Sequence, residues 1–397
     1  MAPLPNPLPH RALYAAFDRV PSPKGASTHV EKFAGCLFDS FGGGFLHVLG
    51  DSSLPSYQRE ESVEAVRFEP VDGNQLARAL AYGTSLSSVL GGLDGTLEIC
   101  HFRDPWSGVP ILDREHHYAT VFEVNGLPSI ELPGIYPRLS PSTIAKIRNA
   151  ERFCWENSDA IVVPSHGIAE ALIRLGAPGN RIEVIPNGAD PSHARPERPQ
   201  QAPPRYLLYF GALQKWQGMD VLLQAFARLA DIPDLHLVVC SSSHHRMGKP
   251  YLRLAERLGI VDRLVWMEGL GRSELVRWVA HASASLAPLT ECARNVEQGC
   301  CPLKILESMA LGTPVVASDL PAVREIATDR EARLVHPDRP VELARALRVL
   351  LEYPEASRAM GERGKERLER YFTWEGSLLK LRDLYRRVLG NNQIGDL

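Results

Sequence analysis

A lysine and a glutamate one helical turn apart lie near the start of a short amphipathic segment. Apolar side chains recur at helical spacing through residues 302–311, while Lys304 and Glu307 fall on another face. The free N–H groups at a helix start favour a diphosphate, and Lys304 adds positive charge there. Glu307 can accept hydrogen bonds from two ribose hydroxyls. An isolated pair of this kind is more often a solvated helix edge, so the surrounding residues decide between the two readings.

The residues after this pair predict a tight turn into a buried strand. Gly312 can end the helix in a left-handed conformation, Pro314 prevents its continuation, and branched residues follow. The whole stretch resembles the donor-site signature of the retaining GT-B glycosyltransferases of glycosyltransferase family 4, also called glycosyl transferases group 1. The resemblance implies that Glu307 binds the ribose of a nucleotide-sugar and that Lys304 lies near its phosphates, so both are catalytic candidates.

A glycine-containing loop after the expected strand 205–210 resembles the donor-phosphate loop of that family. It begins at Gly211, which we take as a donor-binding candidate. The family's arginine and lysine are replaced by Ala212 and Gln217, and Lys215 is the charge that remains. A solvated loop lysine is an equally good reading of Lys215, and between the two lysines the pattern favours Lys304.

The loop before the Lys304 segment departs from the family at one position. The family usually has a glutamate that contacts the transferred sugar, and here that position is Gly299. Glu291 and Glu297 lie nearby, and Arg294 in the same loop is a further donor-binding candidate.

The loop after the first expected strand contains Lys24 and Gly25. A glycine between a strand and a helix lets backbone N–H groups approach a phosphate closely, so Gly25 is a donor-binding candidate. The loop resembles the family's Gly-Gly loop with Lys24 in place of the first glycine, and Lys24 can contact acceptor or phosphate. An ordinary turn is an equal alternative for the loop taken alone.

Polar residues follow two neighbouring strands of the first half. His101 and Arg103 end one strand, and Glu123 ends another. Asn125 stands where many family members have a histidine near the reacting sugar; it can hydrogen-bond a hydroxyl but cannot act as a base. We expect these four residues on the acceptor side, with Asn125 as a catalytic candidate. Capping or bracing of strands is at least as probable for Glu123 and His101 taken singly.

Apolar strands alternate with helical stretches along the chain, which is the pattern of parallel sheets covered by helices. The first half has expected strands at 13–17, 46–49, 65–68, 97–100, 120–124 and 160–163, and expected helices at 28–37, 74–90, 141–157 and 167–175. The second half has expected strands at 205–210, 235–240, 263–267, 284–287 and 314–317, expected helices at 218–230, 247–259, 272–280 and 302–311, and a helical tail from 339 to 389.

A proline-rich, polar stretch separates the two halves. The sequence therefore predicts an α/β protein of two doubly wound, Rossmann-like domains facing across a cleft, the GT-B architecture. We place an N-terminal acceptor-side domain at 1–190, a linker at 191–204 and a nucleotide-sugar-binding domain at 205–372. The resemblance implies that a final segment, 373–397, crosses back to the N-terminal domain.

Composition excludes several classes of protein. The 397 residues carry a net charge of −3, which argues against nucleic acid as the main partner. Seven scattered cysteines favour a reduced, cytoplasmic setting, and no apolar run reaches membrane-span length. No Asp-x-Asp motif occurs, and no carboxylate cluster accompanies the paired histidines, whose adjacent side chains diverge, so we expect no metal and no cofactor. Basic residues near 138–152 leave peripheral contact with the inner face of the membrane open, although a solvated helix face is favoured over it.

The resemblance implies a hexosyltransferase-like enzyme that moves a sugar from a nucleotide-sugar to an acceptor hydroxyl with retention. A glycan or lipid-linked acceptor in polysaccharide or glycoconjugate biosynthesis fits the family. Two alternatives stay open: a GT-B nucleotide-sugar epimerase or phosphorylase, and a sugar-nucleotide-binding protein without catalysis. The second alternative is plausible because four positions depart from the family pattern: Gly299, Ala212, Gln217 and Asn125.

Overall fold

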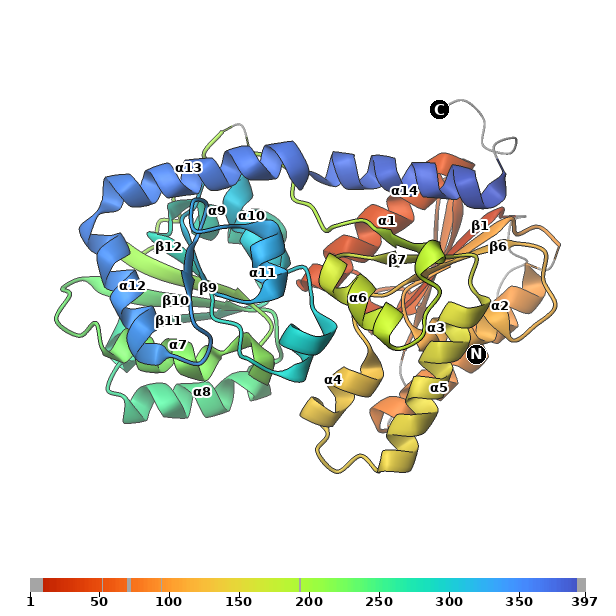
Figure 1. The fold of residues 1–397 in the computed structure, drawn as a ribbon, viewed down its shortest axis with the longest axis horizontal. Coiled ribbons are helices and arrows are strands. Elements are labelled where there is room, and N and C mark those ends of the chain that lie inside the picture. Colours follow the sequence, from red (N-terminus) through yellow and green to blue (C-terminus); the bar gives the residue numbers. More distant parts are fainter. Residues whose placement is uncertain (1–9, 52, 70–72, 94, 193, 391–397) are drawn as a thin grey trace. The chain divides into compact units, whose positions relative to one another are not determined.

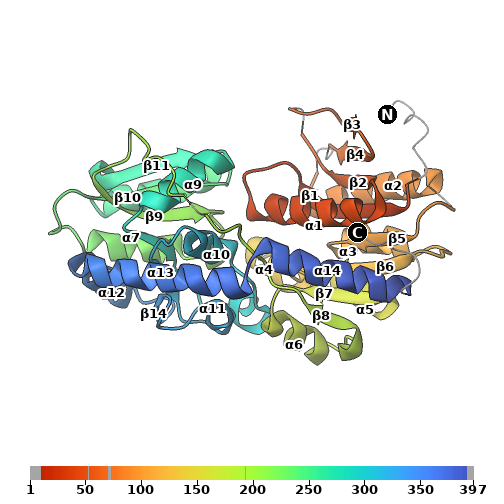
Figure 2. The same ribbon diagram turned by 90° about the horizontal axis from the view of Figure 1, so that it is seen from above.

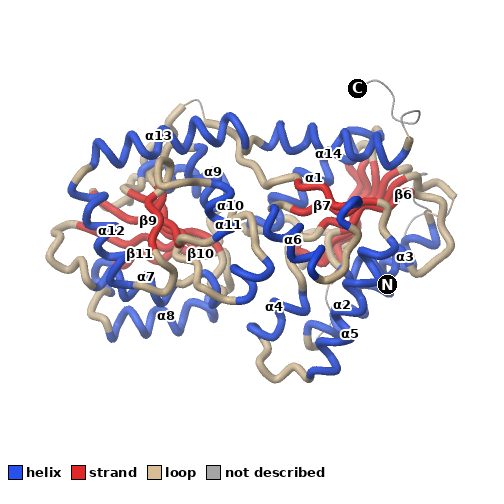
Figure 3. Tube along the Cα trace, viewed as in Figure 1, coloured by secondary structure: helices blue, strands red, loops and turns tan. Residues whose placement is uncertain are grey.

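The structure is a computed structural model that describes residues 10–51, 53–69, 73–93, 95–192 and 194–390. The described chain forms two compact units, and each is considered by itself. The first unit contains residues 10–22, 26–185 and 378–390, and the second contains residues 23–25 and 186–377. The sheets and their flanking helices are drawn in Figures 1 and 3. None of the helices in the described ranges is long and apolar enough to cross a membrane.

The first unit is built on an eight-stranded sheet in the order β3-β4-β2-β1-β5-β6-β7-β8. All neighbours pair in parallel except β3, which is antiparallel to β4. The strands are β1 (Ala12–Arg19), β2 (Gly44–Leu49), β3 (Tyr57–Glu60), β4 (Val63–Phe68), β5 (Ile99–Phe102), β6 (Ala119–Glu123), β7 (Ala160–Val163) and β8 (Ile182–Val184).

Helices cover both faces of this sheet because successive side chains of each buried strand point to opposite sides. Leu13 and Ala15 of β1 belong to the core cluster under α2, α3, α5 and α6. Tyr14 faces the other side, where α1 and α14 contribute Phe33 and Tyr385. The helices of this unit are α1 (Gly25–Phe41), α2 (Gln75–Gly92), α3 (Pro105–Leu112), α4 (Pro128–Ile135), α5 (Pro141–Asn157) and α6 (His166–Arg174).

The second unit has a six-stranded, wholly parallel sheet in the order β11-β10-β9-β12-β13-β14. Its strands are β9 (Arg205–Gly211), β10 (Leu235–Ser241), β11 (Leu264–Glu268), β12 (Ala284–Ala287), β13 (Val315–Ser318) and β14 (Arg333–Val335). The chain reverses direction across the sheet between β9 and β12, and the crevice beyond the carboxyl ends of such strands is where open parallel sheets bind ligands.

Side chains alternate along β9 in the second unit as well. Leu207 and Tyr209 pack toward α7 and α12, which Figure 2 shows side by side, while Tyr206 and Leu208 pack toward α9. The helices that follow the strands are α7 (Met219–Ala227), α8 (His245–Arg257), α9 (Arg272–His281), α10 (Leu303–Ala310), α11 (Pro321–Ile326), α12 (Pro340–Glu352), α13 (Pro354–Tyr371) and α14 (Trp374–Leu389). Residues 378–390 of α14 count with the first unit.

Most expected elements lie within a few residues of the observed ones, with instructive differences. The strand expected at 97–100 is β5, two residues later, because it continues through the fully buried His101. Helices α3 and α4 were not predicted. Each contains an internal proline, Pro110 or Pro133, which disfavours a helix interior, but proline also starts both helices, where its missing N–H costs nothing. Three short strands, β3, β8 and β14, were also not predicted.

The residues around the expected linker differ from the sequence-based division. The second unit begins at Pro186 rather than after residue 204, and it includes the stretch expected to be a linker. That stretch is fixed to the second unit by hydrogen bonds: Lys365 donates to the carbonyl of Ser192, and Arg195 donates to the carbonyl of Ala280.

Candidate active site

The chemistry of the second unit centres on helix α10, which begins beside the carboxyl ends of β9 and β12. Its N-terminal residue Pro302 provides no side-chain cap, so the first N–H groups have no partner within the helix. Lys304 and Glu307 occupy the first two turns. Gly312 follows the helix with φ of +65°, and β13 begins three residues later, so the predicted sequence of helix, tight turn and buried strand is confirmed.

Lys304 is buried against the end of β9. Its Nζ donates to Gln217 Oε1 at 2.6 Å and lies 4.1 Å from the centre of the Tyr209 ring. Gly211 is adjacent, since a Cβ added there would lie 3.7 Å from Nζ. Burial lowers the pKa of Lys304 to about 7, and Glu307 opposes that shift. A nearby anion raises the pKa of a buried ammonium and so favours its charged form.

Glu307 is half-buried, one turn further along α10. Burial raises its pKa to about 7, and the positive charges of Arg272 and Lys304 oppose the rise. Arg272 begins α9 and lies 3.8 Å from Asp190 of the same unit. A carboxylate in this position can accept hydrogen bonds from neutral hydroxyl groups.

The donor-phosphate loop that follows β9 is held in one shape by glycine and asparagine. Gly218 has φ of +68°, and a Cβ there would lie 1.8 Å from the carbonyl oxygen of Pro288, so only glycine fits. The buried Asn295 donates to the carbonyls of Trp216 and Thr290 and so joins this loop to the one before α10.

The other donor-side candidates are less enclosed. Lys215 is exposed, and its side chain makes no hydrogen bond or ion pair within the described ranges. The guanidinium of Arg294 lies 5.3 Å from the Trp216 ring, and its Nη1 donates to Asn295 Oδ1 at 3.0 Å. The structure thus brings Lys304, Gly211 and Gln217 into contact and leaves Lys215 at the surface.

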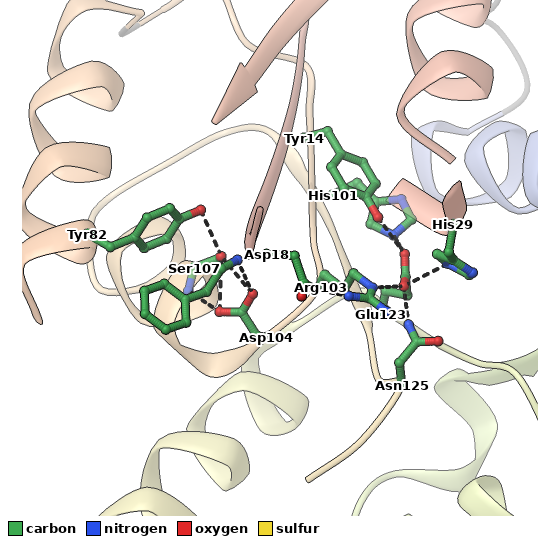
Figure 4. Close-up of polar contacts among 11 residues, drawn as sticks. Tyr14, Asp18, His29, Tyr82, His101, Arg103, Asp104, Ser107, Glu123 and Asn125 are labelled. Carbon is green, nitrogen blue, oxygen red and sulfur yellow. Dashed lines mark hydrogen bonds and ion pairs between the residues drawn. The ribbon is translucent and has the colours of Figure 1, made fainter. Parts of the chain in front are cut away.

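The first unit has a buried polar cluster around Glu123 at the end of β6, drawn in Figure 4. Glu123 Oε2 accepts from the Tyr14 hydroxyl at 2.7 Å, and Oε1 accepts from Arg103 Nε at 2.9 Å and from the amide of Asn125. The ring nitrogens of His29 and His101 lie 2.8 and 3.3 Å from the carboxylate.

Cationic neighbours decide the ionisation of this carboxylate. Burial acts to raise the pKa of Glu123, but the charge of His29, hydrogen bonds from both histidines and the charge of Arg103 outweigh burial and hold the pKa well below its usual range. Burial lowers the pKa of His101, whose Nδ1 lies 2.7 Å from the Tyr385 hydroxyl. Glu123 is therefore an anion that orients its neighbours.

A half-buried carboxylate, Asp104, lies directly before α3. It accepts from the backbone N–H groups of Phe17 and Ser107 at 2.6 and 2.9 Å, which ties α3 to the end of β1. Arg103, the residue before it, also pairs with Asp18. Arg103 and Asn125 are the members of the sequence-predicted set that keep solvent access, while Glu123 and His101 are buried.

The remaining two candidates of the first half are Lys24 and Gly25. Lys24 is exposed in the loop before α1, and Gly25 is the first residue of that helix. Both count with the second unit.

Two family models together match most of the chain. The model for Glycosyltransferase Family 4 matches residues 23–193, and the model for Glycosyl transferases group 1 matches residues 204–353. The chain belongs to glycosyltransferase family 4. The sequence-based assignment to this family, and to its GT-B fold of two parallel-sheet domains, is confirmed.

Individual relatives agree with the family assignment. A D-inositol 3-phosphate glycosyltransferase from Xylanimonas cellulosilytica is 29% identical over 247 residues, which cover 58% of this chain and 57% of that protein. The chain spans little more than half the length of the curated relatives it matches. A sucrose-phosphate synthase from Thermosynechococcus elongatus has the same fold, with a TM-score of 0.75 and 20% identity over 96% of this chain and 100% of that one. HepE of Anabaena, solved with UDP-glucose, has a TM-score of 0.73 and 14% identity over 95% of this chain and 100% of that one.

The family's missing glutamate has a structural explanation in this chain. Gly299 has φ of +87°, a conformation that non-glycine side chains rarely adopt. It ends a short π-helix, Arg294–Gln298, so the loop before α10 has a shape that a glutamate at position 299 would strain. Gln217, which stands where the family has a lysine, also has a partner in this chain, because Lys304 donates a hydrogen bond to its side chain.

Several residues of the site were not identified from the sequence. His29 and Tyr14 contact Glu123, and Tyr209 and Gln217 contact Lys304. Tyr14 and Tyr209 sit within apolar strands and look like core residues, so only the three-dimensional neighbours reveal them. Within the described ranges no three His, Cys, Asp or Glu side chains are grouped as a metal site requires.

Proposed function

We propose that this chain transfers a sugar from a nucleoside-diphosphate sugar to an acceptor hydroxyl. The observation that carries the proposal is the start of α10 beside the carboxyl end of β9, where Lys304 and Glu307 accompany free helix N–H groups. Because the chain spans only about half of its curated relatives, the activity of the whole protein is part of this proposal.

The reaction breaks the bond between the anomeric carbon and the donor phosphate oxygen, and the acceptor oxygen forms the new bond to that carbon. Negative charge develops on the diphosphate as it leaves, so the main task of the protein is to stabilise that charge. Lys304 and the N–H groups of α10 are suited to this role. Glu307 accepts hydrogen bonds from the ribose hydroxyls and fixes the nucleoside.

We further propose retention of configuration, as is usual in the family. The attack then comes from the face that the diphosphate leaves, and the acceptor proton passes to a phosphate oxygen of the donor. This assignment fits the character of Asn125, which can bind a hydroxyl but cannot take its proton. No metal ion or other cofactor is required by the proposed steps.

On the acceptor side, the residues of the Glu123 cluster that reach solvent contact the acceptor directly. Arg103 and Asn125 both donate to Glu123 and keep part of their surface free. Glu123 and His101 then act as positioning residues that hold these donors in place. Lys24 is proposed to meet acceptor or phosphate through its charge.

Two similar proteins suggest which donor and which acceptor to test first. HepE of Anabaena binds UDP-glucose, which makes uridine diphosphate sugars the first donors to test. The relative from Xylanimonas is named for a phosphorylated inositol acceptor. A glycan or lipid-linked acceptor on the cytoplasmic side of a membrane remains part of the proposal.

The test is binding of diphosphates and diphosphate sugars of uridine, guanosine, adenosine and thymidine, measured by calorimetry with and without EDTA. Glu307→Gln and Lys304→Met should each weaken donor binding by at least tenfold, since each removes a charged hydrogen-bonding partner. Lys215→Met is the matched control and should change it about twofold, because that lysine is exposed.

Unchanged affinity in both α10 variants would contradict the proposed donor site. Donor binding followed by neither transfer to any acceptor nor slow hydrolysis would instead favour a binding protein without catalysis. Release of a rearranged nucleotide-sugar or of free sugar epimer would favour the epimerase alternative.

A further inference from the structure

The second unit contains a cavity of about 410 Å³ at the edge of its sheet opposite to Lys304. Arg205 at the first position of β9 lines it, as do Ser283 directly before β12 and Pro314 directly before β13. Gly211, by contrast, lies at the last position of β9. Because the strands are parallel, their amino ends share one edge, so this cavity is separate from the proposed donor site.

Positive charge dominates the lining of this cavity. Arg195, Arg205, Arg358 and Lys365 line it, against the single carboxylate of Glu362. None of the four cations forms an ion pair with any residue that the structure describes. Charges that face a cavity without counter-ions attract an anion from solution.

The hydrogen bonds of these cations leave donors for a ligand. Arg205 donates to the carbonyl of Leu351, Arg195 to that of Ala280 and Lys365 to that of Ser192. Each guanidinium has five N–H donors and each ammonium three, so one carbonyl partner uses only part of them. The side chain of Arg358 makes no hydrogen bond within the described ranges.

The simpler role for two of these residues is the capping of helix ends. Leu351 is near the end of α12 and Ala280 near the end of α9, where cations compensate free carbonyls. That role does not account for Arg358, which lies in the second turn of α13, at the positive end of a helix. The positive charge of this arginine adds to the partial positive charge of the helix N-terminus, and together they attract an anion.

We propose that this cavity binds a small phosphorylated molecule of about sugar-phosphate size. Arginine and lysine donors match phosphate oxygens in charge and geometry. The volume falls within the range of small-molecule sites and exceeds what a lone phosphate ion fills. The cavity also contacts Leu311 and Gly312, directly after α10. The inference goes beyond the proposed function and does not depend on it.

The experiment is calorimetric titration of the full chain with glucose 6-phosphate, inorganic phosphate and glucose at low ionic strength. Glucose 6-phosphate should bind, with glucose giving no heat. Arg358→Gln should weaken binding about five- to tenfold, because one charged partner is lost, and Glu362→Gln should tighten it by about twofold or more. Arg370→Gln, on the same helix but outside the cavity lining, is the matched control and should leave binding unchanged.

A parallel titration of Lys304→Met distinguishes this site from the donor site. Binding that Lys304→Met leaves intact and Arg358→Gln weakens supports the cavity, whether or not the chain transfers sugar. Binding that follows Lys304 and ignores Arg358, or no heat at millimolar glucose 6-phosphate, would overturn the proposal and leave helix capping as the role of these cations. Equal affinity for inorganic phosphate and glucose 6-phosphate would overturn the assignment to a sugar-phosphate-sized ligand.

Discussion

Lys304 and Glu307 are both shifted by burial to pKa values near 7, in opposite directions from their usual ranges. In the proposed donor site, binding needs Lys304 protonated and Glu307 ionised. Affinity should therefore fall as pH rises above about 7, when Lys304 loses its proton, and also as pH falls below about 7, when Glu307 gains one. Because Lys304 and Glu307 interact, the two apparent pKa values of the pH profile belong to the pair and not to either residue alone. Calorimetry with UDP-glucose from pH 5.5 to 9 should give a bell, with each limb changing at most about tenfold per pH unit.

Variants separate the two limbs of this profile. Lys304→Arg should extend binding into alkaline solution, because an arginine stays charged, and Glu307→Gln should flatten the acid limb. The exposed Lys215→Met leaves the shape unchanged and serves as the control. A profile that is flat in the wild type would show that neither group changes charge on binding.

Glu123 should be a large contributor to the stability of the first unit. Glu123→Gln keeps the shape but removes the charge that balances Arg103, and uncompensated buried charge is costly. We expect the free energy of unfolding of this unit to fall by about 3 kcal/mol. Glu98→Gln, which breaks the half-exposed pair with Arg11, should cost about 1 kcal/mol or less. Urea-dependent hydrogen exchange in peptides from β5 and β6 measures both, and equal losses would contradict a structural role for the Glu123 charge.

At the scale of elements, helix α4 illustrates a structure held by a partner distant in sequence. Leu127, the residue before the helix, provides no side-chain cap. Instead the buried carboxylate of Glu151 on α5 accepts from the Ser129 N–H and hydroxyl, each at 2.7 Å. Ser129→Ala leaves one carboxylate oxygen without its partner and should cost about 1–2 kcal/mol. Amides of α4 should then exchange faster by mass spectrometry. Ser140→Ala removes the cap of α5 itself, so its effect should appear in α5 and not in α4.

The local sequence pattern was enough to predict the strands and helices that pack against apolar surface and need no particular polar partner. The run at 160–163 and the helix at 141–157 match β7 and α5, because a buried apolar run and a capped amphipathic period each specify one structure. Helices α3 and α4 were not predicted because their stability depends on single polar residues, Asp104 and Glu151, acting on segments that contain proline.

The site shows the same division. The places of Lys304 and Glu307 near a helix start and of Gly211 at a strand end follow from local sequence signatures, while their donor-binding roles stay predictions that rest on the family resemblance. Tyr209, which contacts Lys304, and His29, which contacts Glu123, were not predicted, because nothing in the sequence around them indicates these contacts. The strain that excludes glutamate at Gly299 also appears only in the backbone conformation.

At the scale of the whole molecule, the buried titratable groups predict that the two units differ in acid stability. In the first unit, burial lowers the pKa of His47 to about 3 and also lowers that of His101, while the pKa of Glu123 is well below its usual range. Below about pH 6.5 the unfolded chain gains protons at these groups that the folded unit does not, so stability falls with pH. For His47 the loss approaches about 4 kcal/mol by pH 3. Glu151, whose pKa burial raises to about 7, opposes this with a gain between about pH 7 and 4.5, and Asp104, whose pKa burial also raises, opposes it at lower pH.

The second unit has pKa shifts of both signs in acid. Hydrogen bonds lower the pKa of Asp231, Asp319, Glu331 and Glu342, but these carboxylates are partly or fully exposed, so each adds only a small loss of stability as pH falls. Glu307, with its pKa raised to about 7, takes up a proton in the folded state before the unfolded chain does, so it adds stability as pH falls. Hydrogen exchange at pH 7, 5 and 4 should therefore show β1, β2 and β5 opening before β9, β10 and β12. His47→Asn should delay opening of the first unit, whereas replacing the exposed His336 with asparagine should not. If the strands of the second unit opened first, the buried histidines would not govern the order, and packing of the two cores would have to set it instead.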